Sequence, residues 1–189
     1  EIHAAPFGLY APDPSLYPRN PLSRLIAEEF CRSPGGGDLR QGLRKFQTVM
    51  TSYLRHMRGV LCEPSQIIPV TGLESALDLT ARVMIDPGHC VYVEDPAHDI
   101  VGRYLRSAGA QIVPVPGDNN GADIGRASGP PPRLIFASPS VSFPLGFQMS
   151  DARREAMLRV VRDAKAVVFE CDAPWELAYT GGRIRAMQG

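Results

Sequence analysis

Short apolar segments alternate with amphipathic stretches through most of this chain, and the alternation constrains its fold more than any other feature. We expect strands at 67–70, 90–95, 111–116, 133–139 and 167–171, and helices between them at 73–85, 100–108 and 151–162. In the first of these helices Leu77, Ala81 and Met84 are expected to face inward, Ser150 is expected to cap the last, and the Gly/Pro-rich segment 117–132 is expected to form a loop. Strands that are apolar throughout and are separated by helices are typical of a parallel sheet that is covered on both faces. The sequence therefore predicts a three-layer α/β/α domain with a mainly parallel sheet.

The first part of the chain has a different character. Residues 1–20 are rich in proline and are predicted to form an extended arm, after which Asn20 is a suitable N-cap and Pro21 suits the first position of a helix. A second helix is indicated by apolar residues at spacings of three and four, namely Leu43, Phe46, Val49, Met50, Tyr53, Leu54 and Met57. We expect two regions, the arm at 1–20 and one domain at 21–189.

Charge and cysteine usage exclude several classes of function. The 20 basic and 20 acidic residues give a formal net charge of zero, so nothing attracts this segment to nucleic acid or to an anionic membrane surface. No apolar run has the length of a membrane span. The four cysteines lie far apart without a CxxC pair, which predicts free thiols in a reducing cytoplasm and no metal site.

Polar residues follow the expected strands at the points where a ligand would bind. In parallel sheets, ligands bind beyond the carboxyl ends of the strands. The segments at these positions are Thr71-Gly72-Leu73-Glu74, Asp95-Pro96-Ala97-His98, Ser138-Pro139-Ser140-Val141-Ser142 and Glu170-Cys171-Asp172. We therefore predict the candidate site at this edge of the sheet.

These strand ends, in this order, carry a resemblance to a known family. The stretches are FGLYAPDPSLYPRNPLSRL, YLRHMRGVLCEPSQIIPVTGLESALDLTARVMIDPGHCVYVEDP, RLIFASPSVSFPLGFQMS and FECDAPWELAYTGGRIRAMQG. From about residue 7 to 189 the chain resembles the aminotransferase-like domain of MocR-type regulators, in the GntR family, whose fold is that of type I pyridoxal phosphate (PLP) enzymes. The resemblance implies an incomplete large domain that lacks the lysine-bearing segment and the C-terminal small domain.

The resemblance also implies roles for individual residues around the phosphate of PLP. Thr71 and Gly72 match the family's phosphate-binding turn. Leu73 stands where the family usually has Ser or Thr, and Glu74 stands where it usually has Gln. A carboxylate near a phosphate costs on the order of 4 kcal/mol at 4 Å and an effective dielectric of 20, so Glu74 opposes phosphate binding. The alternative is that Glu74 only stabilises the first turn of a helix.

Around the ring, the matched positions are His98 for the stacking aromatic residue and Ser142 for part of a His-Gln pair. The carboxylate that binds the ring nitrogen falls on Cys171, and a neutral thiol does not hold a pyridinium proton. A shift of one residue would place Asp172 there instead, and would turn the strand's side chains to the opposite faces. The sequence leaves open which of Cys171 and Asp172 faces the site.

The expected function is a degenerate aminotransferase-like domain, a pseudoenzyme that serves in ligand sensing or assembly. No catalytic lysine is expected, because neither Lys45 nor Lys165 lies at the carboxyl end of a predicted strand. PLP is the family's cofactor, and we expect this chain not to bind it. One alternative is a PLP-dependent aminotransferase or regulator domain seen as a partial chain, and another is new acid–base or thiol chemistry. Unpaired strand edges predict a homodimer or a complementary subunit.

Overall fold

A computed structural model describes residues 14–32, 39–172, 175–177 and 184–188. The chain divides into two compact units, 1–46 and 47–189, and each is described by itself. Most of the predicted N-terminal arm, residues 1–13, lies outside the described residues.

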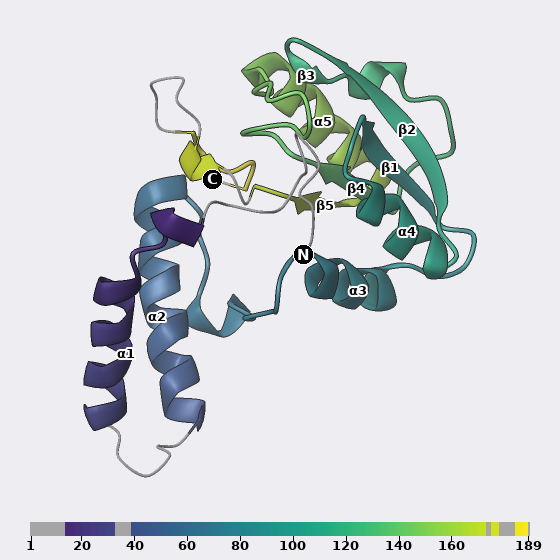
Figure 1. Cartoon of the computed structure of the whole chain (residues 1–189). Coiled ribbons are helices and arrows are strands. Elements are labelled where there is room, and N and C mark those ends of the chain that lie inside the picture. Colours follow the sequence, from purple (N-terminus) through teal and green to yellow (C-terminus); the bar gives the residue numbers. More distant parts are fainter. Residues whose placement is uncertain (1–13, 33–38, 173–174, 178–183, 189) are drawn as a thin grey trace, which may run out of the picture. The chain divides into compact units, whose positions relative to one another are not determined.

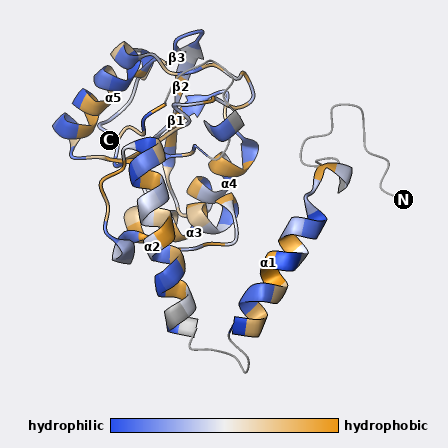
Figure 2. Ribbon diagram, turned by 90° about the vertical axis from the view of Figure 1, so that its left-hand side faces the viewer, coloured by the Kyte–Doolittle hydropathy of each residue, from blue (hydrophilic) through white to orange (hydrophobic). Residues whose placement is uncertain are grey.

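The first unit contains a 3-10 turn at Pro14–Leu16, helix α1 at Arg19–Arg32 and the start of helix α2, which spans Leu39–Arg58 and continues into the second unit. The Pro18 carbonyl accepts the first helical hydrogen bond of α1, so the N-cap predicted at Asn20 is wrong and Asn20 lies inside the first turn. Hydrophobic and hydrophilic residues are interspersed along α1 (Figure 2). The Lys45 Nζ donates to Glu29 at 2.9 Å, which links α1 to the start of α2.

The second unit is built on a five-stranded sheet of order β3-β2-β1-β4-β5 (Figure 1). Its strands are β1 at Cys90–Asp95, β2 at Gln111–Asp118, β3 at Gly121–Ala122, β4 at Leu134–Ala137 and β5 at Val167–Glu170. β1 pairs in parallel with β2 and β4, and β4 pairs in parallel with β5. The predicted α/β class with a mainly parallel sheet is confirmed.

Helices cover both faces of this sheet (Figure 1). They are α3 at Leu73–Met84, α4 at Asp99–Ser107 and α5 at Asp151–Ala164. The Ser150 hydroxyl accepts from the Arg153 N–H and caps α5, as the sequence predicts. In the described ranges, no helix combines the length and the apolar character that crossing a bilayer requires.

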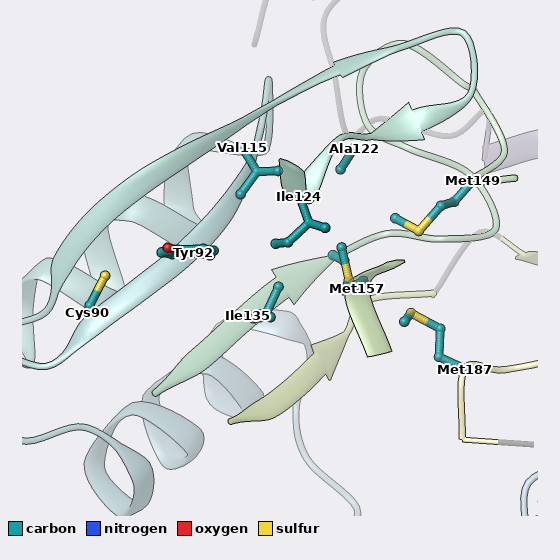
Figure 3. Packing of buried hydrophobic residues seen from close by; sticks show 10 residues of the cluster. Cys90, Tyr92, Val115, Ala122, Ile124, Ile135, Met149, Met157 and Met187 are labelled. Atoms are coloured by element: carbon teal, nitrogen blue, oxygen red, sulfur yellow. The ribbon is translucent and has the colours of Figure 1, made fainter. Parts of the chain in front are cut away.

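Two hydrophobic clusters flank the sheet because neighbouring strand residues point to opposite faces. On one face the cluster joins β1, β2, β4 and α5, and Met149, Met157 and Met187 gather at one end of it (Figure 3). On the other face, Val91 and Val93 of β1 pack with residues of α3 and α4. The predicted inward residues Leu77 and Ala81 of α3 are both buried there.

The strand predicted at 67–70 is not part of the sheet. A 3-10 turn at Pro64–Gln66 precedes it, and the side chain of Ile68 is 73% exposed. Within the described residues no strand pairs with the outer edge of β5. An apolar extended segment becomes a strand only beside a partner, and 67–70 has none in this part of the chain.

The Gly/Pro-rich segment 117–132, predicted as a loop, contains structure of its own. It begins with the hairpin of β2 and β3 and continues into a 3-10 turn at Ile124–Arg126. Gly121 has φ +90°, and a Cβ there would lie 2.8 Å from the Cα of Met149. Only glycine permits this close approach, so the backbone of β3 packs directly against the segment before α5.

Candidate functional site

A buried cluster of polar side chains lies where β4 and β5 end. Asp172 follows β5, Ser140 follows β4, and Arg58 is the last residue of α2. The Ser140 backbone N–H and Oγ–H donate to the Asp172 carboxylate at 2.9 and 2.5 Å, and the Arg58 guanidinium also donates to it. Arg58 and Ser140 are only 3% and 1% exposed, so these charges meet away from bulk water.

Glu170, the last residue of β5, shares the same guanidinium. The Arg58 Nη2 lies 3.2 Å from Glu170 Oε1, and the backbone N–H of Met187 donates to both carboxylate oxygens. Burial, together with the neighbouring Asp172 carboxylate, raises the pKa of Glu170 to about 7. Burial alone would also raise the pKa of Asp172, but the hydrogen bonds from Ser140 and Arg58 outweigh it and lower that pKa.

Arg58 is held on a second side by an aromatic ring. Its guanidinium carbon lies 4.9 Å from the ring centroid of Trp175, within the range of a cation–π contact. Tyr53 lies beside the same indole, with the ring centroids 6.2 Å apart, and donates a hydrogen bond to Glu176. Arg58 Nε and Nη1 are buried without a hydrogen-bond partner among the described residues.

A third carboxylate, Glu94 of β1, lies near the same strand ends. Its Oε2 accepts from the Ser138 backbone N–H at 2.8 Å, while Oε1 is buried without a partner in the described residues. Burial raises the pKa of Glu94, a shift that its hydrogen bonds from Ser138 partly oppose. Glu94 therefore anchors the turn after β4 through the Ser138 N–H.

The predicted phosphate turn lies at the N-terminus of α3. Gly72 is the N-cap with φ +115°, and a Cβ at this position would meet nothing within 4 Å. The Thr71 hydroxyl is 2.7 Å from that of Ser75, so it is already engaged within the turn. Glu74 is exposed in the first turn of α3, where a carboxylate stabilises the helix.

The predicted ring contacts His98 and Ser142 have local partners. His98 Nδ1 accepts from the Ile100 N–H and caps α4, and its ring stacks on Phe143 with centroids 5.3 Å apart. The Ser142 hydroxyl accepts from the Phe147 N–H at 3.0 Å, within the turn between β4 and α5. Both residues have structural partners that account for their positions.

The two candidates for the ring-nitrogen position differ in their surroundings. Cys171 packs against the hydrophobic cluster beneath α3 and α4, and its backbone N–H donates to the Ala137 carbonyl. Asp172 has both carboxylate oxygens hydrogen-bonded within the cluster of Arg58 and Ser140. Glu170 and Asp172 are brought together. The other two residues that the alternative of new acid–base or thiol chemistry uses are engaged elsewhere, because Cys171 packs beneath α3 and α4 and His98 caps α4.

The fit to PLP is therefore partial. The open N-terminus of α3 at Gly72 suits a phosphate, which binds well to helix N–H groups. The ring nitrogen needs a carboxylate with a free oxygen, whereas Cys171 offers a thiol and Asp172 is already paired with Arg58. The residues present fit the phosphate but not the protonated ring.

Sequence reasoning missed Arg58, although Ser140 and Glu170 lie in segments that it singled out. Arg58 directly precedes Gly59, which has φ +74° and ends α2. A cation at a helix C-terminus followed by glycine is a common helix ending, so this pattern does not distinguish a buried arginine from an exposed one. The signal that could have found it is the demand of two neighbouring carboxylates for a cation.

Comparison with known proteins identifies the family of the chain. The family described as aminotransferase class I and II matches residues 38–173. The chain is 36% identical over 148 residues to the probable rhizopine catabolism regulatory protein MocR of Rhizobium meliloti, covering 78% of this chain and 30% of that protein. It is 31% identical over 158 residues to the pyridoxine biosynthesis transcriptional regulator PdxR of Corynebacterium glutamicum, covering 84% and 34%.

Solved structures show the same fold. An archaeal alanine:glyoxylate aminotransferase superposes with a TM-score of 0.81 and 28% identity, over 94% of this chain and 46% of that one. The α-aminoadipate aminotransferase LysN of Thermus thermophilus gives a TM-score of 0.67 and 25% identity, over 86% and 42%. The chain thus spans about a third of these curated relatives and under half of these enzymes. By its sequence and its fold, the chain belongs to the class I and II aminotransferase family and resembles the aminotransferase-like part of MocR-type regulators.

Proposed function

We propose that this chain is a degenerate aminotransferase-like domain that serves in ligand sensing or assembly and does not carry out PLP catalysis. The observation that carries the proposal is the pairing of Asp172 with Arg58 and Ser140. A carboxylate that is buried against a guanidinium is a poor partner for a pyridinium, because the arginine already satisfies its charge. Cys171, at the matched position, offers a thiol in place of a carboxylate.

Equilibrium dialysis of the 189-residue chain against pyridoxamine phosphate tests this proposal. Pyridoxamine phosphate has the ring and phosphate of the cofactor but an amine in place of the aldehyde, so it does not react with Lys45 or Lys165. We expect no retention beyond that of inorganic phosphate. The proposal would be refuted if one equivalent of pyridoxamine phosphate bound in dialysis and stayed with the protein in a subsequent gel filtration. A shift of the ring absorbance from its value in water would then show that the ring itself is bound.

A second candidate is a PLP-dependent regulator or aminotransferase domain whose Schiff-base lysine comes from residues outside these 189. Gly72 favours it, because the helix N-terminus there is open to a phosphate. The same dialysis separates the two candidates, since this one requires the ring as well as the phosphate to bind. If the second candidate is right, Asp172→Asn should lose binding of the ring. If the first is right, the substitution should not change the amount of pyridoxamine phosphate bound in dialysis.

The assembly part of the proposal concerns the outer edge of β5. Within the described residues this edge has no neighbouring strand, and Val167 at its start is 39% exposed. An unpaired edge is a template for another strand. We therefore propose that the chain associates through β5, with a second copy as the partner.

A further inference from the structure

A short segment near the end of the chain covers the polar cluster. We call residues 184–187 the strap. The Ala186 N–H donates to the Arg58 carbonyl at 3.0 Å, the Met187 N–H donates to the Glu170 carboxylate, and Arg154 Nη1 donates to the Arg185 carbonyl at 2.8 Å. Three strap residues are buried: Ile184, Ala186 and Met187. The strap therefore packs against the end of α2, the end of β5 and helix α5.

The charges beneath the strap do not balance when all groups are ionised. One guanidinium, that of Arg58, faces the carboxylates of Glu170 and Asp172. Glu94 of β1 adds a further carboxyl, whose pKa is raised by burial and, to a smaller extent, by Asp172. Arg154 of α5 is engaged with backbone carbonyls. Tyr53 of α2 and Glu176 form a pair of their own beside Trp175.

The proton that resolves this imbalance belongs on Glu170. Asp172 receives three donors, two from Ser140 and one from Arg58, so its ionised form is well stabilised. Glu170 receives the Met187 N–H and a longer contact of 3.2 Å to Arg58. Two carboxylates that share one cation in a buried site lose their protons at separate pH values, and the less well solvated group ionises last.

We propose that the strap is a pH-operated latch, closed while Glu170 carries a proton and released when Glu170 ionises. An ionised Glu170 beside Asp172 leaves a buried net negative charge. Hydration of Glu170 relieves this charge, and water reaches it when the strap moves away. Burial and the neighbouring Asp172 carboxylate raise the pKa of Glu170, and they outweigh the Met187 N–H and the Arg58 charge, which lower it. The inference does not depend on whether PLP binds.

Two measurements can follow the latch. One is the fluorescence of Trp175, which is the only tryptophan of the chain and stacks on Arg58. The other is the rate of trypsin cleavage after Arg185, measured by mass spectrometry and normalised to the cleavage of a peptide substrate, which reports release of the strap directly. We expect the normalised cleavage rate to rise about tenfold between one pH unit below and one above the pKa of Glu170. The emission of Trp175 should change with the same midpoint.

Variants assign the transition to its group. Glu170→Gln mimics the protonated side chain, so its cleavage rate should stay low and flat across the range. Asp172→Asn removes the neighbouring charge, and its midpoint should move to lower pH. Glu155→Gln removes an exposed carboxylate of α5 and should leave the wild-type midpoint unchanged.

The latch fails as an idea if wild-type cleavage after Arg185, once normalised, is flat between pH 5.5 and 8.5. It also fails if Glu170→Gln keeps the wild-type midpoint, which would assign the transition to a histidine or another group. The wild-type cleavage profile needs no variant, so misfolding of Asp172→Asn does not remove the test.

Discussion

Ser140 and Asp172 are joined by two hydrogen bonds, one from the Ser140 backbone N–H at 2.9 Å and one from its hydroxyl at 2.5 Å. The turn after β4 is thereby fixed to the end of β5. Ser140→Ala removes the hydroxyl and leaves a buried carboxylate oxygen with one donor fewer. We expect a loss of about 1–3 kcal/mol in the free energy of unfolding, measured by urea denaturation at pH 7. Ser107→Ala, at an exposed helix end, is the control and should stay within about 0.5 kcal/mol of wild type.

Arg58 should be far more costly to remove than an exposed arginine. Arg58→Met leaves Asp172 and Glu170 buried without their cation, and we expect a loss of about 3–5 kcal/mol at pH 7 by denaturant unfolding. Arg82→Met breaks an exposed pair with Asp78 and should leave the free energy of unfolding almost unchanged. Equal losses in the two variants would mean that the buried cluster contributes no more than a surface ion pair.

Glu94 should give the stability a pH dependence of its own. Its pKa is raised in the folded state, so the folded chain binds the proton more tightly than the unfolded chain does. Stability from this group is then fully present below the unfolded pKa and is lost as the pH rises through the folded pKa. Glu94→Gln cannot ionise, so its unfolding free energy should fall less than that of wild type as the pH rises from 4.5. An unchanged slope would contradict this prediction, and Glu155→Gln is the matched exposed control.

The edge of β5 makes a prediction about association. The N–H groups of Val167 and Cys171 donate toward β4, so the alternate N–H of Val168 points to the outer edge. Val168→Pro removes that N–H donor. Val168→Ala also removes the valine side chain but keeps the backbone N–H. We expect wild type and Val168→Ala to sediment as a dimer and Val168→Pro as a monomer. A wild-type chain that is monomeric at all concentrations would exclude association through β5.

Glu74 should weaken anion binding at the N-terminus of α3. Glu74→Gln removes a carboxylate from the first turn, beside the open position at Gly72. We expect inorganic phosphate to bind about two- to fivefold more tightly, which corresponds to about 0.4–1 kcal/mol. Isothermal titration at low ionic strength measures this change, and Asp78→Asn, farther along α3, should leave phosphate affinity unaltered.

Local patterns predicted the elements well where burial and periodicity agree. The spacing of Leu77 and Ala81 places both on the inner side of α3, and the hydroxyl of Ser150 caps α5 as expected. The prediction of a strand at 67–70 is wrong, because β propensity says how well a segment suits a sheet but not whether a partner strand lies beside it. The start of α1 was wrong by a few residues, since the Pro18 carbonyl serves where Asn20 was expected.

The sequence predicts that polar residues gather at the strand ends, but it does not predict which of them contact one another. The strand ends bring Glu170, Asp172 and Ser140 together, as parallel topology requires. Arg58 joins them from the end of a helix 82 residues before Ser140, and no local spacing encodes a contact of that length. Whether Cys171 or Asp172 faces outward depended on one residue of register, which the pattern VVFEC left open.

The hairpin at Gly121 limits how copies of this chain can add to one another. Its β3 strand is two residues long and its backbone is packed against Met149, so it offers an incoming strand little to pair with. In the association that we propose, growth of the sheet is then confined to the outer edge of β5. A sheet that pairs through one edge only forms a closed dimer about a two-fold axis. A sheet with two edges able to pair could instead add further copies and form an open fibre.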